Sequence, residues 1–253
     1  MALNPPIRSW AGRRVWVVGA SSGIGAQTAS VLLARGARVA VSARSAQGLR
    51  ERFGVQAAIV PADVTDADGL RAAAREVASA WDGIDLTLNF AGTYREMRPW
   101  ELDLAAARGI VELNLLGALN LLAALQPHLA PGSGIGFAGS VAGYGGLPNS
   151  LAYGASKAGL INLAQSLWLD YRARGVAVYL INPGFVDTPL TARNRFPMPF
   201  LISAQDAAQR TVRGLERGAF EIHYPARFTR ILKLLNLLPH GLYLRCIRKF
   251  TGA

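Results

Sequence analysis

The sequence predicts an α/β protein in which a doubly wound, mostly parallel seven-stranded sheet lies between two helical layers, followed by a C-terminal helical extension. Three observations support this fold class. Short β-branched segments alternate with longer segments rich in alanine and leucine, which is typical of parallel strands joined by helical crossovers. The strands are almost continuously apolar, as in VWVV at residues 15–18, which indicates burial on both faces of the sheet. A glycine-rich turn separates the first strand from the first helix.

The elements follow from hydrophobic periodicity and from their start and stop signals. Gly36 ends the first helix, and Ser203 is suited to cap the last helix of the sheet region. The predicted strands are residues 14–19, 38–43, 57–60, 85–90, 134–138, 176–181 and 219–222. The predicted helices are residues 26–35, 67–80, 102–125, 152–174 and 203–217.

The composition favours one large globular domain, since 51% of the 253 residues are hydrophobic and 17% are charged. The single cysteine, Cys246, cannot form an internal disulfide, which favours a reducing compartment and a cytoplasmic location. Residues 1–14 lack the apolar stretch of a secretory signal, and no apolar run is long enough to predict a transmembrane helix. The net charge of +11 is uneven, because residues 193–253 hold eleven Lys/Arg and three acids.

A glycine-rich loop joins the first strand to the first helix. It reads Gly-Ala-Ser-Ser-Gly-Ile-Gly over residues 19–25, and its glycines let the backbone turn sharply and approach a pyrophosphate without Cβ clashes. The helix that follows offers unpaired N–H groups and the positive end of its dipole. The spacing departs from the general G-x-G-x-x-G fingerprint, so a plain surface turn remains the alternative. The predicted phosphate-binding residues are Gly19, Ser21, Ser22, Gly23, Ile24 and Gly25.

The end of the second strand predicts the type of dinucleotide. NAD sites commonly place an Asp or Glu about 20 residues past the glycines, where it holds the ribose 2′-OH. Here the strand ends Ser42-Ala43-Arg44 without an acid. Arg44 can form a charge-assisted hydrogen bond with a 2′-phosphate, which favours NADP(H) over NAD. A solvated arginine in a turn is the alternative.

Tyr153 and Lys157 form the most informative pair in the chain. They are four residues apart at the start of a predicted helix, so their side chains share one face. A free tyrosine titrates near pH ~10, and a nearby ammonium lowers that pKa by favouring the phenolate. Such a tyrosine can exchange a proton with an alcohol or a carbonyl oxygen while a hydride moves. On its own, the pair also fits an ordinary helix surface.

The order and spacing of these motifs, over about residues 12–222, resemble the classical type of the short-chain dehydrogenase/reductase (SDR) family. Phe90 stands where that family usually has a second asparagine, a departure expected to matter little for chemistry. The further matching positions are Asp63-Val64, Asn89-Phe-Ala-Gly92, Asn114, Ser140 and the segment Asn182-Pro-Gly-Phe-Val-Asp-Thr188.

The resemblance implies a Rossmann fold, a homodimer or homotetramer, and roles for these residues. Ser140 would orient the substrate oxygen, Tyr153 would be the acid/base, and Lys157 would hold the nicotinamide ribose and tune Tyr153. Asn114 would fix a water in a proton relay towards Lys157. The implied cofactor contacts are Asp63 and Val64 at the adenine, Asn89, Ala91 and Gly92 after the fourth strand, Tyr153 and Lys157 at the ribose, and Pro183, Gly184, Val186 and Thr188 near the nicotinamide. No His or Cys cluster has metal-ligand spacing, so no metal is expected.

The favoured function is an NADP(H)-dependent oxidoreductase acting on CH–OH groups, interconverting a ketone or aldehyde with an alcohol. A non-catalytic NADP(H)-binding regulatory protein is the alternative, although such a protein would not need a proton relay. Nucleic-acid binding is disfavoured, because no aromatic stacking platforms accompany the basic charge. Residues 188–200, with Tyr144, Leu147 and Phe185 as pocket walls, favour an apolar, lipid-like small-molecule substrate.

Residues 1–225 are predicted to form the dinucleotide-binding catalytic domain, and residues 226–253 a basic amphipathic extension. In the extension, Phe228, Ile231, Leu232, Leu235 and Leu238 recur at helical spacing opposite Arg230, Lys233 and Asn236, and Pro239 and Gly241 are expected to break the helix. A basic amphipathic helix can lie at a membrane interface, which would make the protein peripheral to the inner face of the membrane. The alternative is a helix whose leucine stripe packs on the domain or on a second subunit, covering the substrate cleft.

Overall fold

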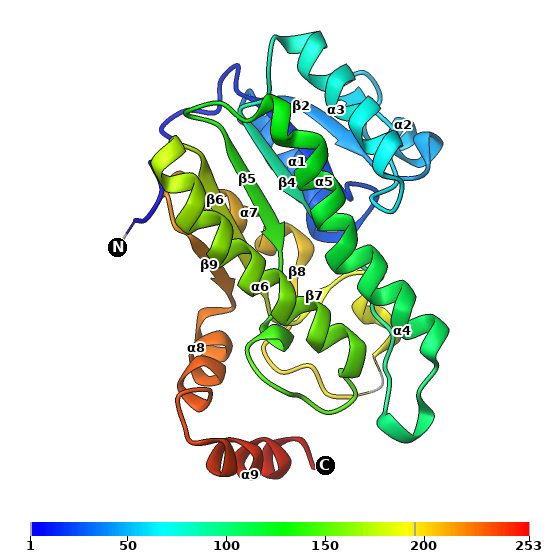
Figure 1. Ribbon diagram of the computed structural model, residues 1–253, viewed down its shortest axis with the longest axis vertical. Helices are drawn as coiled ribbons and strands as arrows, with labels where there is room; N and C mark the ends of the chain where they lie inside the picture. The colour runs from blue at the N-terminus through cyan, green and yellow to red at the C-terminus, as the bar shows by residue number, and fades with distance from the viewer. Residues whose placement is uncertain (1, 195, 253) are drawn as a thin grey trace.

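The middle layer is a parallel seven-stranded sheet in the order β3-β2-β1-β4-β5-β6-β9 (Figure 1). The computed structural model describes residues 2–194 and 196–252. Every neighbouring pair of strands runs parallel, so the predicted α/β fold class is confirmed, with a fully rather than mostly parallel main sheet. The strands are β1 (Arg14–Val18), β2 (Arg38–Ser42), β3 (Ala58–Ile59), β4 (Leu86–Asn89), β5 (Gly134–Ala138), β6 (Ala177–Pro183) and β9 (Glu221–Tyr224).

Helices cover both faces of the sheet, since alternate residues of each strand point into two separate cores. Val15 and Val17 of β1 pack with α1 (Gly23–Ala34), α2 (Ala46–Phe53) and α7 (Ala204–Glu216). Trp16 and Val18 pack with α3 (Ala67–Trp81), α5 (Gly117–Leu125) and α6 (Leu151–Tyr171). Because successive strand side chains face opposite sides, a strand buried on both sides has to be apolar throughout.

The longest predicted helix, 102–125, is interrupted. Asp103 caps α4 (Leu104–Val111) through a hydrogen bond from the Ala106 N–H at 3.0 Å. A π-helical turn, Glu112–Leu116, then joins α4 to α5. Such turns are rare and occur often at functional sites.

One helix, α2, and one pair of short strands were not expected from the sequence. Ser45 caps α2, but Leu49 and Phe53 are the only buried residues of that helix, which is too weak a pattern to detect. The pair β7 (Val186–Asp187) and β8 (Ile202–Ser203) forms a small second sheet of two residues per strand. The last main strand begins at Glu221, two residues later than predicted, and α1 begins at Gly23, three residues earlier.

By length and composition, the helical stretch Leu104–His128 is apolar enough to cross a membrane, the only such helix among the described residues. Its side chains Ala118, Leu121 and Leu125 are nonetheless buried in the core beside α3. We therefore interpret it as a core helix of the sheet layers.

The C-terminal extension forms α8 (Ala226–Leu235) and α9 (His240–Thr251), which extend from the end of β9 below the sheet in Figure 1. The predicted break between two helical segments is confirmed, with Pro239 at the boundary, but Gly241 takes no part in it. Pro239 caps the start of α9, and Gly241 lies in the first turn of that helix, while α8 has already ended at Leu235.

Candidate functional site

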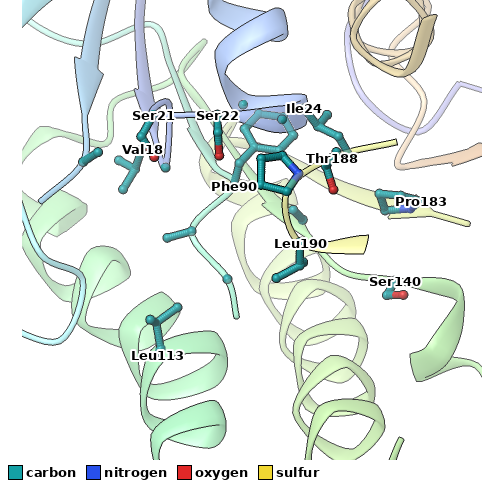
Figure 2. Close-up of a pocket in the computed structure, with 18 of the residues that line it drawn as sticks. Val18, Ser21, Ser22, Ile24, Phe90, Leu113, Ser140, Pro183, Thr188 and Leu190 are labelled. Carbon is teal, nitrogen blue, oxygen red and sulfur yellow. The ribbon is translucent and has the colours of Figure 1, made fainter. Parts of the chain in front are cut away.

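A cleft opens at the carboxyl ends of the parallel strands. It lies where the strand order reverses between β1 and β4, which is where open α/β sheets bind ligands. Its walls come from the segments after β1, β2, β4, β5 and β6. Figure 2 shows Ser21, Ser22 and Ile24 from the loop and the start of α1, with Phe90 and Leu190 in the middle of the view.

The glycine-rich loop is shaped for a close backbone approach. Gly19 has a φ of 81°, and a Cβ there would lie 2.4 Å from the Ala91 nitrogen. A Cβ at Gly25 would lie 2.4 Å from the Gly19 carbonyl oxygen. Ser22 precedes α1 without capping it through its side chain, and the first turn of α1 carries no acid. The N-terminal N–H groups of α1 are thus directed at the cleft, which fits a pyrophosphate.

Arg44, Asp63 and Val64, which were predicted to contact the adenosine part of a cofactor, line one end of the cleft. Arg44 is exposed and follows β2 directly. The Asp63 carboxylate accepts hydrogen bonds from the Thr65 N–H at 2.9 Å and from its hydroxyl at 2.8 Å, which holds the turn after β3 in place.

Ser140, Tyr153 and Lys157 meet at the other end of the cleft. Ser140 starts the short helical turn after β5, and its hydroxyl also bonds to the Tyr153 phenol. Lys157 is 4% exposed and lies with its Nζ 5.6 Å from the centre of the Tyr153 ring. The same Nζ donates a hydrogen bond to the Ala138 carbonyl at 2.7 Å. Tyr94 packs edge-on against Tyr153, with ring centres 4.9 Å apart.

Burial has the largest effect on the pKa values of Tyr153 and Lys157. It raises the pKa of Tyr153, and the hydrogen bond with Ser140 opposes this only in part. It lowers the pKa of Lys157 to about 8. The expectation that the ammonium would lower the pKa of Tyr153 is therefore wrong for the protein alone, because desolvation of the phenol outweighs any stabilisation of the phenolate.

Asn114 lies in the π-helical turn and is fully buried. Its side-chain oxygen accepts from the Thr93 N–H at 2.8 Å, and its amide donates to the Thr93 carbonyl and to the Ser156 hydroxyl at 3.0 Å each. Asn114 thus ties the segment after β4 to α6, the helix that carries Tyr153. All these bonds go to protein groups, so a relay through Asn114 remains a prediction.

Most predicted cofactor contacts do line the cleft, including Ala91, Gly92 and the segment with Pro183, Gly184, Val186 and Thr188. Asn89 is not among the described lining residues. It is buried in β4, where its side-chain oxygen accepts from the Ala91 N–H at 3.0 Å. It therefore shapes the turn that presents Ala91.

Several lining residues were not predicted from the sequence. Phe90 was expected to matter little for chemistry, yet it lines the cleft, and Figure 2 shows it near the middle of the view. The sequence signal that could have identified Phe90 was its difference from the asparagine that the family usually has at this position. The other additional lining residues are Val18, Ala43, Ala62, Leu113, Ala138 and Gly139, whereas Pro189, Leu190 and Thr191 belong to the segment 188–200 that was predicted to face the substrate. The predicted pocket walls Tyr144, Leu147 and Phe185 are not among the described residues that line the cleft.

Tyr144 instead belongs to a polar cluster around Glu221. The Glu221 carboxylate accepts hydrogen bonds from the Tyr144 hydroxyl at 2.6 Å and from the Asn182 amide at 2.8 Å. It also pairs with the Lys233 amine of α8. The cluster joins the segment after Ser140, the end of β6 and the C-terminal extension. Burial acts to raise the pKa of Glu221, but the bonds from Lys233, Tyr144 and Asn182 outweigh it and hold that pKa below its ordinary value.

We expect Glu221→Gln to lower the free energy of unfolding by about 2 kcal/mol at neutral pH, because charge-assisted hydrogen bonds become neutral and Lys233 loses its partner. Since the folded pKa is depressed, this contribution is present above the unfolded pKa and is lost as the pH falls through the folded value. The difference in the free energy of unfolding between Glu221→Gln and wild type should therefore become smaller below about pH 4. Urea unfolding at several pH values measures it, with Glu76→Gln on the exposed side of α3 as the control. An equal effect of both variants would contradict the role of the cluster.

Within residues 2–194 and 196–252, no group of three or more His, Cys, Asp or Glu side chains is placed to hold a metal ion.

Comparison with known proteins agrees with this geometry. Residues 13–197 match the family model described as short chain dehydrogenase. An uncharacterized oxidoreductase of Myxococcus xanthus is 37% identical over 244 residues, which cover 91% of this chain and 94% of that protein. The cis-4-hydroxycyclohexanecarboxylate dehydrogenase of Sinomonas cyclohexanicum is 38% identical over 218 residues, covering 83% and 86%. A crystal structure of a short chain dehydrogenase from Burkholderia cenocepacia in complex with NADP superposes with a TM-score of 0.84 at 29% identity, covering 94% of this chain and 98% of that one. The chain therefore belongs to the short-chain dehydrogenase/reductase family of NAD(P)-binding oxidoreductases.

Proposed function

We propose that the protein is an NADP(H)-dependent oxidoreductase that interconverts a ketone or aldehyde with the corresponding alcohol. The observation that carries this proposal is the meeting of Ser140, Tyr153 and Lys157 in the same cleft as the glycine-rich loop. A donor hydroxyl, a proton carrier and a cation are the groups that such a reaction needs beside the cofactor. NADPH, when bound, supplies the hydride for the carbonyl carbon.

The protein's own groups handle the carbonyl oxygen. Ser140 donates a hydrogen bond to it, and Tyr153 transfers its phenolic proton as negative charge develops there. Because burial keeps the Tyr153 phenol neutral, the residue is prepared to act as an acid in the reducing direction. In the oxidising direction, the charges of Lys157 and of the oxidised cofactor would favour the phenolate. Lys157 is also placed to hold the nicotinamide ribose, and Asn114 to support a proton relay.

The residues of the cleft fit NADP(H). Gly19 and Gly25 leave no room for side chains, and the start of α1 carries no competing acid. Arg44 lines the cleft just after β2, where it can pair with a 2′-phosphate. The NADP-bound relative described above supports the same preference.

Replacing Arg44 with alanine should raise the KM for NADPH by about 10- to 100-fold, since a charge-assisted hydrogen bond is worth about 1.5–3 kcal/mol. The KM for NADH should change by less than about threefold, because NADH carries no group for Arg44 to neutralise. Steady-state kinetics with both cofactors test this. The exposed Arg50 of α2 provides the control variant Arg50→Ala. Equal loss with both cofactors would argue against a 2′-phosphate contact.

An apolar carbonyl or alcohol is the proposed substrate class, and a lipid-like one is included. Leu113, Pro189 and Leu190 contribute apolar surface to the cleft. One relative is named for the oxidation of cis-4-hydroxycyclohexanecarboxylate, which supports a cyclic secondary alcohol among the candidates. The test is consumption of NADPH against a panel of cyclic ketones, long-chain ketones and aldehydes. Tight NADPH binding without turnover across that panel would favour a regulatory nucleotide-binding protein instead.

We further propose a homodimer or homotetramer in the cytoplasm. Leu116, Leu119 and Leu169 are exposed on the outer surface of the helical layer, where a second subunit could cover them. Light scattering after gel filtration measures the assembly.

A further inference from the structure

We propose that α8 and α9, which we call the C-terminal arm (residues 226–252), form a surface that binds anionic lipid bilayers. The proposal starts from the side of α8 that touches the domain. Thr229 is fully buried and hydrogen-bonds to the His223 ring at 2.6 Å. Lys233 pairs with Glu221, and Asn236 lies beside Gly145. These three positions follow helical spacing, so polar side chains form part of the side of α8 that meets the domain, together with Phe228.

Several apolar side chains of α8 and of the residues just after it are exposed, although Phe228 packs on the domain and Leu232 and Leu235 are partly buried. Ile231 is 48% exposed and Leu234 is 65% exposed, and Leu237 after the helix is 81% exposed. A helix on a water-soluble domain normally buries such a stripe and exposes its polar side. In the predicted stripe of Phe228, Ile231, Leu232, Leu235 and Leu238, only Ile231 is exposed and the other four side chains are partly buried. Leu234 and Leu237 lie beside that stripe and are the most exposed apolar side chains of this segment. The arm presents an apolar face that needs another partner.

The second helix also exposes apolar side chains. Tyr243 and Ile247 of α9 are buried, and the Tyr243 hydroxyl donates to the Gly146 carbonyl at 3.0 Å, which fixes α9 beside the segment that follows Ser140. Leu242, Leu244 and Phe250 are exposed, and Phe250 reaches 76%. The arm is thus held in place while its outer side stays apolar.

Positive charge surrounds the apolar side chains. Residues 226–253 contain six Lys/Arg and no Asp or Glu. Among the residues that the structure describes, Lys233 is the only one of these cations in an ion pair. The other five are all exposed, and they are Arg227, Arg230, Arg245, Arg248 and Lys249. Exposed leucine and phenylalanine interleaved with arginine and lysine are typical of helices that lie in the headgroup region of a bilayer.

This charge pattern also argues against a second copy as the partner. In a two-fold symmetric contact the same patch meets itself, so unpaired cations of both copies would approach without any acid in the arm to neutralise them. An anionic bilayer supplies both the negative charge and the apolar layer.

The position of the arm connects this surface to the cleft. The Phe228 ring stacks on Phe185 at 5.4 Å and on Phe200 at 6.1 Å, and it packs against Gly184, which lines the cleft. In Figure 1 the arm lies at the end of the molecule towards which the parallel strands point. Bilayer contact through the arm would therefore hold the cleft side of the protein close to the lipid.

The test is co-sedimentation of the full-length protein with vesicles of phosphatidylcholine containing 30% phosphatidylglycerol, compared with pure phosphatidylcholine. Wild type should bind the anionic vesicles at least about tenfold more tightly. The triple variant Arg245→Gln/Arg248→Gln/Lys249→Gln should bind them roughly 100-fold more weakly, at about fivefold per lost cation. The matched control, Arg52→Gln/Arg71→Gln/Arg75→Gln on α2 and α3, removes the same charge from exposed positions away from the arm and should bind within about twofold of wild type.

A second pair of substitutions separates bilayer insertion from simple attraction to polyanions. Leu234→Ser/Leu237→Ser leaves every charge in place and should weaken vesicle binding about tenfold or more, because less apolar area is buried. Unchanged NADPH binding shows that each variant is folded. Equal vesicle binding by wild type and both arm variants would overturn the proposal. So would arm variants that change only the oligomeric state, which would assign the surface to a second copy.

Discussion

Replacing Tyr153 with phenylalanine should reduce kcat/KM for carbonyl reduction by about 1,000-fold or more while leaving NADPH affinity within about threefold of wild type. Positioned proton transfer contributes about 100- to 10,000-fold to such reactions, and phenylalanine keeps the ring but removes the proton. The buried ring should keep its edge-on contact with Tyr94, so little structural change is expected. The measurements are steady-state NADPH consumption and fluorescence titration of the cofactor.

Tyr94→Phe is the matched control for this substitution. It removes a hydroxyl from the neighbouring ring, 4.9 Å away between centres, without touching the group that contacts Ser140. Its kcat/KM should stay within about fivefold of wild type, because Tyr94 has no part in the proposed proton transfer. If the two variants lost activity equally, the acid/base role would have to be moved away from Tyr153.

Replacing Lys157 with methionine should have opposite effects on activity and on stability. We expect kcat/KM to fall by about 100-fold or more, since the cation beside Tyr153 and the proposed ribose contact are both lost. At neutral pH the free energy of unfolding should rise by about 2 kcal/mol. Burial lowers the pKa of Lys157 from 10.5 to about 8, which costs about 3 kcal/mol at neutral pH, and the lost hydrogen bond to Ala138 offsets about 1 kcal/mol of the gain.

The pH dependence of that stability provides an independent check. Below pH 8 the Lys157 amine is charged in both the folded and the unfolded states of wild type, so folding carries the full free-energy cost of burying that charge. Between about pH 8 and 10.5 the unfolded state binds more protons, and wild type therefore becomes relatively more stable as the pH rises. The higher free energy of unfolding of Lys157→Met, measured by urea unfolding, should therefore disappear between about pH 8 and 10.5. Lys249→Met, at an exposed lysine of α9, should show neither effect. A pH-independent difference would contradict the lowered pKa.

Local patterns were sufficient to predict the architecture. The central strands could be located because a parallel strand buried on both faces must be apolar along its length, as β1 is. The loop at residues 19–25 and the spacing of Tyr153 and Lys157 are also local features, so their presence at one cleft follows once the strands are parallel. The weakly patterned helix α2 escaped detection because two apolar positions do not establish a period.

Properties that depend on distant residues were decided only by the tertiary structure. The sign of the pKa shift of Tyr153 depends on how deeply the fold buries it, which residue spacing does not specify. Glu221 collects donors from Tyr144, Asn182 and Lys233, residues that are far apart along the chain. Periodicity showed that α8 has an apolar side and a polar side, but only the structure shows that the partly exposed ion pair between Lys233 and Glu221 holds one polar position of α8 against the domain. Short-range patterns determine which elements form, whereas burial and long-range pairing determine which face each element presents and which charges it keeps.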